Sequence, residues 1–80
     1  MKTLEEYRKT IDKTDEKILK LLEQRIETVN KIKRIKINLN LPLKDKVREE
    51  EILKNLCAAH SIKPSKIKSL VRFILKFCQD

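Results

Sequence analysis

The feature that most constrains this chain is its first segment, Thr3 to Ile37, which contains neither glycine nor proline. Apolar side chains recur along it at helical spacing, at Leu4, Tyr7, Ile11, Ile18, Leu21, Leu22, Val29 and Ile32. These steps describe one stripe along an α-helix. A helix of about 33 residues would be about 50 Å long, more than the width of an 80-residue globule. We therefore expect a second copy of the chain to cover part of the stripe.

Helix-start signals define this long helix and a second, shorter one. Thr3 followed by Glu6 matches a capping box. The run 38–44 interrupts the pattern, because Pro42 disfavours helix at the residue before it. Asp45 then resembles an N-cap for a helix from about Lys46 to His60. Its apolar side is predicted to consist of Val47, Leu53, Leu56 and Cys57.

A third helix is predicted from about Ser65 to Gln79, with Pro64 in a first-turn position. Its amphipathic spacing is carried by Ile67, Leu70, Val71, Ile74 and Cys78. The sequence therefore predicts an all-α fold, a three-helix protomer with one long and two shorter helices, in which residues 1–80 form one domain.

The composition limits the classes of function that the chain can have. Twenty Lys and Arg against twelve Asp and Glu give a net charge of +8, which suits nucleic acid, an anionic membrane surface or a small anion. The absence of glycine argues against phosphate-cradling loops and dinucleotide fingerprints. No apolar run approaches the length of a bilayer span, no secretory leader is evident, and the two cysteines form no disulfide framework or metal motif, so we expect a cytoplasmic protein.

Two cations interrupt the apolar stripe of the first helix. Arg25 lies between Leu22 and Val29, and Lys36 follows Ile32 by four residues. At 100° per residue the two cations lie about 20° apart around the helix axis. A buried unpaired cation costs several kcal/mol, so acids from elsewhere or an anionic ligand should neutralise this pair. The alternative is that both long side chains reach the edge of the interface and remain solvated.

Three further polar positions are candidates. Arg48 lies in the first turn of the second helix, where a cation opposes the helix dipole unless its side chain meets an anion. Glu49 beside it can accept a hydroxyl proton. Arg8 lies about 100° away from the line of Arg25, so it would reach such a pocket only from a second copy of the chain. From the pattern alone, Arg8 is a solvated surface residue.

These residues together resemble the all-helical chorismate mutase family over nearly the whole chain. The ordered set reads Leu4-x-x-x-Arg8-x-x-Ile11-Asp12-x-x-Asp15, Leu21-Leu22-x-x-Arg25, Ile32-x-x-x-Lys36 and Leu41-Pro42-x-x-Asp45-x-x-Arg48-Glu49. The resemblance implies an intertwined homodimer that converts chorismate to prephenate without a cofactor or a metal. It implies no membrane partner.

The resemblance also implies roles for individual residues. Arg25 and Arg48 would bind the substrate carboxylates, and Arg8 would do so from the other protomer. Lys36 would contact a carboxylate and the ether oxygen of the breaking bond. Glu49 would bind the ring hydroxyl, with Asp45 beside it.

The third helix departs from the family pattern. Cys78 stands where the family commonly has a hydroxyl or amide side chain, so it is included among the substrate-binding candidates. The Gln or Glu donor expected one turn later would fall beyond Asp80. Losing one preorganised donor typically lowers a rate by about 10²–10³-fold, so the sequence predicts a slow mutase.

Three alternatives remain open at this point. A related helical fold could eliminate pyruvate from isochorismate in a similar pocket. The chain could also bind such a ligand without catalysis. The third alternative is a basic helical dimer that binds nucleic acid, but the chain has only 4% aromatic residues and therefore no stacking platform.

Overall fold

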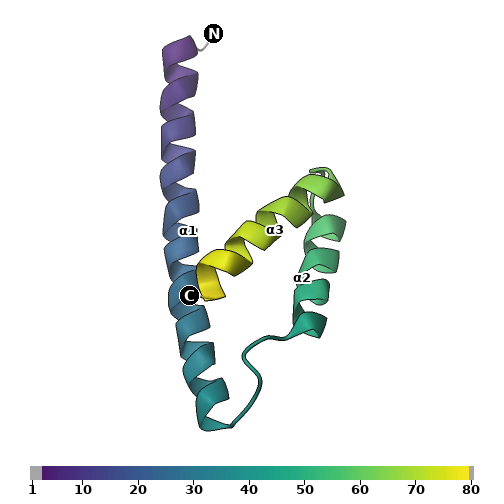
Figure 1. Ribbon diagram of the computed structural model, residues 1–80. Helices are drawn as coiled ribbons and strands as arrows, with labels where there is room; N and C mark the ends of the chain where they lie inside the picture. Colours follow the sequence, from purple (N-terminus) through teal and green to yellow (C-terminus); the bar gives the residue numbers. More distant parts are fainter. Residues whose placement is uncertain (1–2, 80) are drawn as a thin grey trace.

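The computed structural model describes residues 3–79 and consists, over that range, of three α-helices without a β-strand. Helix α1 spans Leu4–Asn38, α2 spans Lys46–Ala59 and α3 spans Pro64–Gln79. The molecule is elongated, with extents of 57 × 24 × 17 Å. In Figure 1, α1 is a long rod, and α2 and α3 form a hairpin beside its C-terminal half, with the end of α3 meeting α1. The predicted all-α architecture is confirmed.

The helix starts follow local side-chain chemistry. The Oγ1 of Thr3 accepts a hydrogen bond from the backbone N–H of Glu6 at 3.2 Å. Likewise, an Asp45 carboxylate oxygen accepts one from the backbone N–H of Arg48 at 3.0 Å. Each cap satisfies a backbone donor that the helix itself cannot pair. Pro64 opens α3, where its missing N–H is not needed.

The end of α1 is a Schellman turn. The Leu41 N–H donates to the Lys36 carbonyl at 2.8 Å, and the Asn40 N–H donates to the Ile37 carbonyl at 3.2 Å. Asn40 has φ 55°, the left-handed conformation that this turn requires and that asparagine tolerates better than most residues. The turn reverses the chain direction and sends it towards α2.

The core lies where α3 meets the other two helices. Ile67, Val71 and Cys78 are buried, and they lie on one face of α3. The half-buried side chains of α1 are confined to its C-terminal part and include Leu22, Ile26 and Val29. This small core fixes the angle at which α3 crosses α1 (Figure 1).

The N-terminal half of α1 is not covered by its own chain. Leu4, Ile11, Ile18 and Leu21 are 56–66% exposed. This agrees with the expectation that a helix of this length cannot bury its whole stripe within one protomer. On α3, Leu70, Phe73 and Phe77 are also largely exposed.

The prediction for the apolar side of α2 was partly wrong. Val47 is 75% exposed, whereas Ile52, which the pattern did not single out, is half-buried with Leu53, Leu56 and Cys57. The reason is angular. Val47 lies five residues before Ile52, which places it about 140° away around the helix.

Candidate active site

A cavity of about 300 Å³ lies between the C-terminal half of α1, the connection to α2, and one face each of α2 and α3. Its lining consists of Arg25, Thr28, Val29, Ile32, Lys33, Lys36, Leu43, Lys44, Asp45, Arg48, Glu49, Ile52, Leu75 and Cys78. We refer to this cavity as the inner pocket. Its walls combine seven charged side chains with five apolar ones, a mixture that suits a small charged molecule.

Arg25 enters the inner pocket from the middle of α1. Its side chain is half-buried, and its NH1 group donates to the Sγ of Cys78 at 2.8 Å. Cys78 is buried on α3, so this contact joins the two helices where they cross. The stripe places Arg25 towards α3 because its neighbours Leu22 and Val29 pack on the same side.

Lys36 lies at the last turn of α1 and is also half-buried. Its Nζ donates to the backbone carbonyl of Leu43 at 3.1 Å. The connection that follows the Schellman turn thus supplies the acceptor for the ammonium group. This contact holds the Lys36 charge at the edge of the inner pocket.

The start of α2 contributes both signs of charge. Arg48 forms an ion pair with Glu51, NH1 to Oε1 at 2.8 Å, and both side chains are largely exposed. The anion that the sequence required for a cation in the first turn is therefore present within the helix. Glu49 is half-buried and lines the inner pocket, while Asp45 caps the helix.

Six of the seven residues proposed from the sequence line this one cavity, namely Arg25, Lys36, Asp45, Arg48, Glu49 and Cys78. Arg8 does not, because it lies on the exposed N-terminal half of α1. The donor position expected one turn after Cys78 lies outside the described residues.

Sequence reasoning missed two cations of the inner pocket, Lys33 and Lys44. Lys33 follows Val29 by four residues and precedes Lys36 by three, so helical spacing alone could have placed it on this face. Lys44 lies in the connection between α1 and α2, where no periodicity applies.

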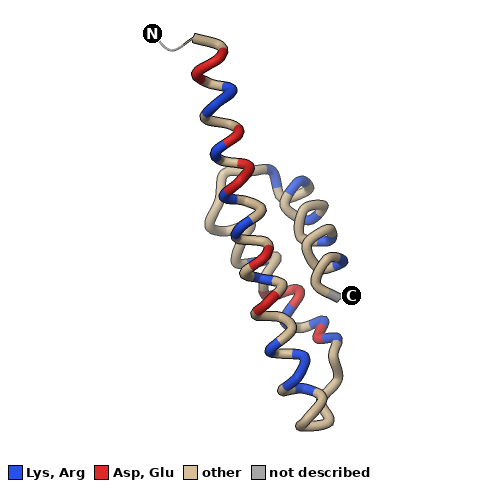
Figure 2. The backbone as a smooth tube through the Cα atoms, turned by 90° about the vertical axis from the view of Figure 1, so that its left-hand side faces the viewer, with Lys and Arg blue, Asp and Glu red and all other residues tan. Residues whose placement is uncertain are grey.

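The charge of the inner pocket favours an anion. Five cations, Arg25, Lys33, Lys36, Lys44 and Arg48, face two carboxylates, Asp45 and Glu49, for a net charge of +3 from 5 − 2. Figure 2 shows Lys and Arg residues, in blue, gathered along the lower part of α1. Among the described residues, no group of three or more His, Cys, Asp or Glu side chains is placed to hold a metal ion.

A pocket of cations and apolar walls, built from three helices, has the composition that suits a small organic anion. The chain belongs to the chorismate mutase type II family, whose model matches residues 7–80. The family resemblance read from the motifs is thereby confirmed.

Three known proteins illustrate this membership. The chain is 39% identical over 62 residues to the chorismate mutase of Methanocaldococcus jannaschii, covering 74% of this chain and 63% of that protein. It is 43% identical over 56 residues to the bifunctional chorismate mutase/prephenate dehydratase of Aquifex aeolicus, covering 70% of this chain and 16% of that protein. The chain thus spans less than two thirds of the length of these two curated relatives.

The fold is also that of a solved structure. The chorismate mutase of Thermus thermophilus superposes with a TM-score of 0.88 at 34% sequence identity. The match covers 94% of this chain and 96% of that chain. No helix among the described residues is long and apolar enough to cross a membrane.

Proposed function

We propose that this chain is a chorismate mutase, an isomerase that converts chorismate to prephenate in the inner pocket, and that residues 1–80 form the catalytic domain. The observation that carries the proposal is the convergence of Arg25, Lys36 and Arg48 on one cavity of about 300 Å³. Family membership indicates chorismate, a dianion, as the substrate, and the net positive charge of the cavity matches it.

The two arginines bind the two carboxylates of the substrate dianion. A guanidinium has five N–H donors in a fixed fork that matches a carboxylate. Arg25 uses one of its nitrogens to contact Cys78 and Arg48 uses one to contact Glu51, so each retains donors for the ligand. Holding both ends of a flexible dianion confines it near the reactive geometry, which lowers the entropic part of the barrier.

Lys36 stabilises charge that grows during the rearrangement. As the C–O bond breaks, negative charge develops on the ether oxygen, and a cation already in place lowers the barrier electrostatically. An ammonium has three donors. One is directed to the Leu43 carbonyl, which fixes the position of Nζ and leaves two for the substrate.

Glu49 accepts a hydrogen bond from the ring hydroxyl, with Asp45 at the adjacent helix start. The reaction is a pericyclic rearrangement, so it requires no nucleophile and no acid–base pair. The work of the pocket is to bind, orient and stabilise charge. For that reason the proposed mechanism uses the chain's own side chains and no cofactor.

We also propose that the functional unit is a homodimer in which Arg8 completes the partner's pocket. The apolar side chains on the N-terminal half of α1 and the exposed Leu70 and Phe77 of α3 support this arrangement. A second copy would cover both surfaces. A protomer of this size buries only about 60% of its unfolded surface alone, so dimerisation would also add stability.

The decisive experiment follows the loss of chorismate absorbance with the wild-type chain and with Arg25→Ala. We expect kcat/KM to fall by about 10²–10³-fold, because a preorganised donor to the substrate is lost. Arg34→Ala is the matched control, since Arg34 is exposed on the same helix and does not line the inner pocket.

Equal turnover by the two variants would exclude the proposed site. Parallel assays with isochorismate, detecting salicylate, and with duplex DNA at several salt concentrations test the lyase and nucleic-acid alternatives. Turnover of chorismate by the wild-type chain, in preference to either, supports the mutase.

A further inference from the structure

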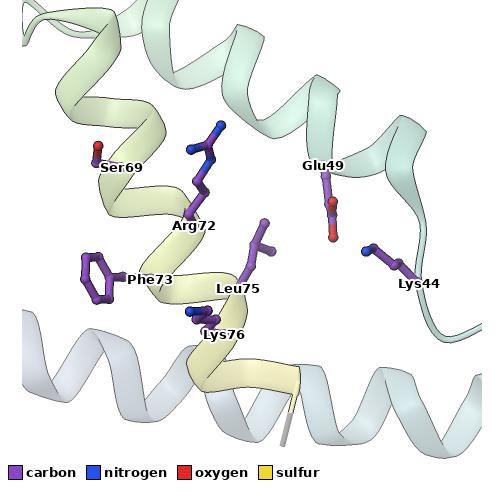
Figure 3. A pocket seen from close by; sticks show the side chains of 7 residues that line it. All are labelled: Lys44, Glu49, Ser69, Arg72, Phe73, Leu75 and Lys76. Atoms are coloured by element: carbon purple, nitrogen blue, oxygen red, sulfur yellow. The ribbon is translucent and has the colours of Figure 1, made fainter.

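A second cavity adjoins the inner pocket and has no role in the mechanism above. It has a volume of about 480 Å³ and opens between the start of α2 and the exposed side of α3. We refer to it as the outer pocket. Its polar lining is formed by Ser69 and the charged Lys44, Glu49, Arg72 and Lys76, and its apolar lining by Phe73 and Leu75 (Figure 3).

The outer and inner pockets are adjacent. Lys44, Glu49 and Leu75 line both cavities, so they form the boundary between them. Figure 3 shows Arg72 and Leu75 projecting from α3 into the space that faces Glu49 and Lys44. A molecule in the outer pocket is therefore adjacent to the inner one.

The outer pocket is positively charged, and its cations are free to interact with a bound anion. Lys44, Arg72 and Lys76 outnumber Glu49 three to one. None of the three cations forms a hydrogen bond or ion pair with the described residues, and all three are exposed. Residues 52–79 contain six Lys and Arg residues and no Asp or Glu, so no carboxylate of α3 neutralises the three cations (Figure 2).

The two pockets differ in how firmly they can hold an anion. The cations of the outer pocket are exposed and solvated, so an ion meets them in a high dielectric and is bound weakly. Arg25 and Lys36 in the inner pocket are half-buried and held by Cys78 and Leu43. Attraction to a dianion therefore strengthens along the path from the outer to the inner pocket.

We propose that the outer pocket is an entry site for the dicarboxylate substrate, which Arg72, Lys76 and Lys44 attract before it moves past Leu75 into the inner pocket. The proposal rests on the proposed function, because it assigns the same substrate to a second cavity. A cleft lined by one sign of charge concentrates an oppositely charged ligand and raises its capture rate. The effect is screened by salt.

The test compares two double variants that remove the same charge. Arg72→Gln/Lys76→Gln neutralises the outer pocket and leaves Lys44 intact, because Lys44 also lines the inner pocket. Lys54→Gln/Lys68→Gln is the control, since Lys54 on α2 and Lys68 on α3 are exposed and line neither cavity. Steady-state kinetics with chorismate are measured from low to high ionic strength, and circular dichroism verifies the helical content of each variant.

We expect the outer-pocket variant to have about fivefold lower kcat/KM than the control at low salt, with kcat unchanged, from Coulomb attraction between two cations and a dianion at a separation of several ångströms. At high salt the two variants should converge. A purely structural role for Arg72 and Lys76 would instead reduce kcat and would not depend on salt.

Three outcomes would overturn the inference. The first is equal kcat/KM for the two variants at every ionic strength. The second is a loss confined to kcat. Both presuppose a wild-type chain that turns over chorismate, so they refute the entry site while the proposed function stands. The third is a wild-type chain without chorismate turnover, which refutes the proposed function and the entry site together.

Discussion

The two halves of α1 have the same helical pattern but very different surroundings. From Leu4 to Leu21 every side chain is exposed, so the other helices of the chain leave this part of the apolar stripe uncovered. From Leu22 onwards the same stripe packs against α3 and contains the half-buried Arg25, Lys33 and Lys36. One half is an exposed apolar surface, and the other is one wall of a pocket.

This difference shows that apolar residues and cations on a helical stripe carry different structural information. Apolar spacing indicates that a face becomes covered, but it does not say by which element. The cations on the stripe identify the part of the face that borders a cavity, because a charge tolerates partial burial only where water, a partner or a ligand meets it. The comparison leads to three predictions, in order of decreasing effect.

Charged substitutions in the exposed N-terminal half of α1 should have the largest effect on assembly and activity. Ile11→Glu/Ile18→Glu introduces two carboxylates into the exposed apolar stripe of α1. We expect a monomer by light scattering and at least about 100-fold lower chorismate mutase activity, because in the proposed dimer the second copy supplies Arg8 and stabilising surface.

The matched control for this variant is Lys13→Gln/Lys20→Gln, which changes the net charge by the same amount on the polar side of the same half. It should remain dimeric and active. A dimeric, fully active Ile11→Glu/Ile18→Glu protein would show that this half of α1 is not an interface.

Mixing two inactive variants tests whether the N-terminal half of α1 in one protomer serves the pocket formed by the C-terminal half of α1 in the other. If Arg8 serves the partner's pocket, a heterodimer of Arg8→Ala and Arg25→Ala chains contains one intact site and one doubly defective site. After the two chains are unfolded and refolded together, we expect about a quarter of wild-type activity, since half of the dimers are mixed and each has one working site.

The control mixture combines Arg25→Ala with Lys36→Met, two changes in the same half of α1. Neither pocket of that heterodimer is intact, so its activity should stay at the level of the separate variants. Absence of recovery in the first mixture would show that Arg8 does not act across protomers.

The smallest effect is expected on α2, in the free energy of unfolding. Ile52→Ala removes a half-buried side chain and should lower the stability by about 1–2 kcal/mol. Val47→Ala alters a side chain that is 75% exposed and should change it by less than about 0.5 kcal/mol. Urea unfolding curves provide both values, and equal destabilisation would contradict the burial of α2 described above.

Much of the fold could be predicted from the sequence because its signals are local. The caps at Thr3 and Asp45 depend on a side chain reaching a backbone N–H three residues away, and Pro64 acts on its own turn. Such interactions require no knowledge of the rest of the chain. The three helices accordingly begin and end within two residues of the predicted positions.

The parts that the sequence did not predict depend on how helices meet. Val47 was assigned to the apolar side of α2 because it is apolar, although its angular position separates it from Ile52. The contribution of Lys44 depends on the path of an irregular connection. The Arg25–Cys78 contact depends on the crossing of α1 and α3, which no spacing within either helix specifies.

Lys36 is held through both its backbone and its side chain, and this limits where the chain can be lengthened. Its carbonyl closes the turn that ends α1, and its ammonium group is bound by the Leu43 carbonyl. An insertion between residues 39 and 45 would therefore displace the Lys36 ammonium group even if the helices remained intact. The connection 60–63 lines neither cavity, so grafted loops and affinity tags belong there, where added length carries only a modest entropic cost.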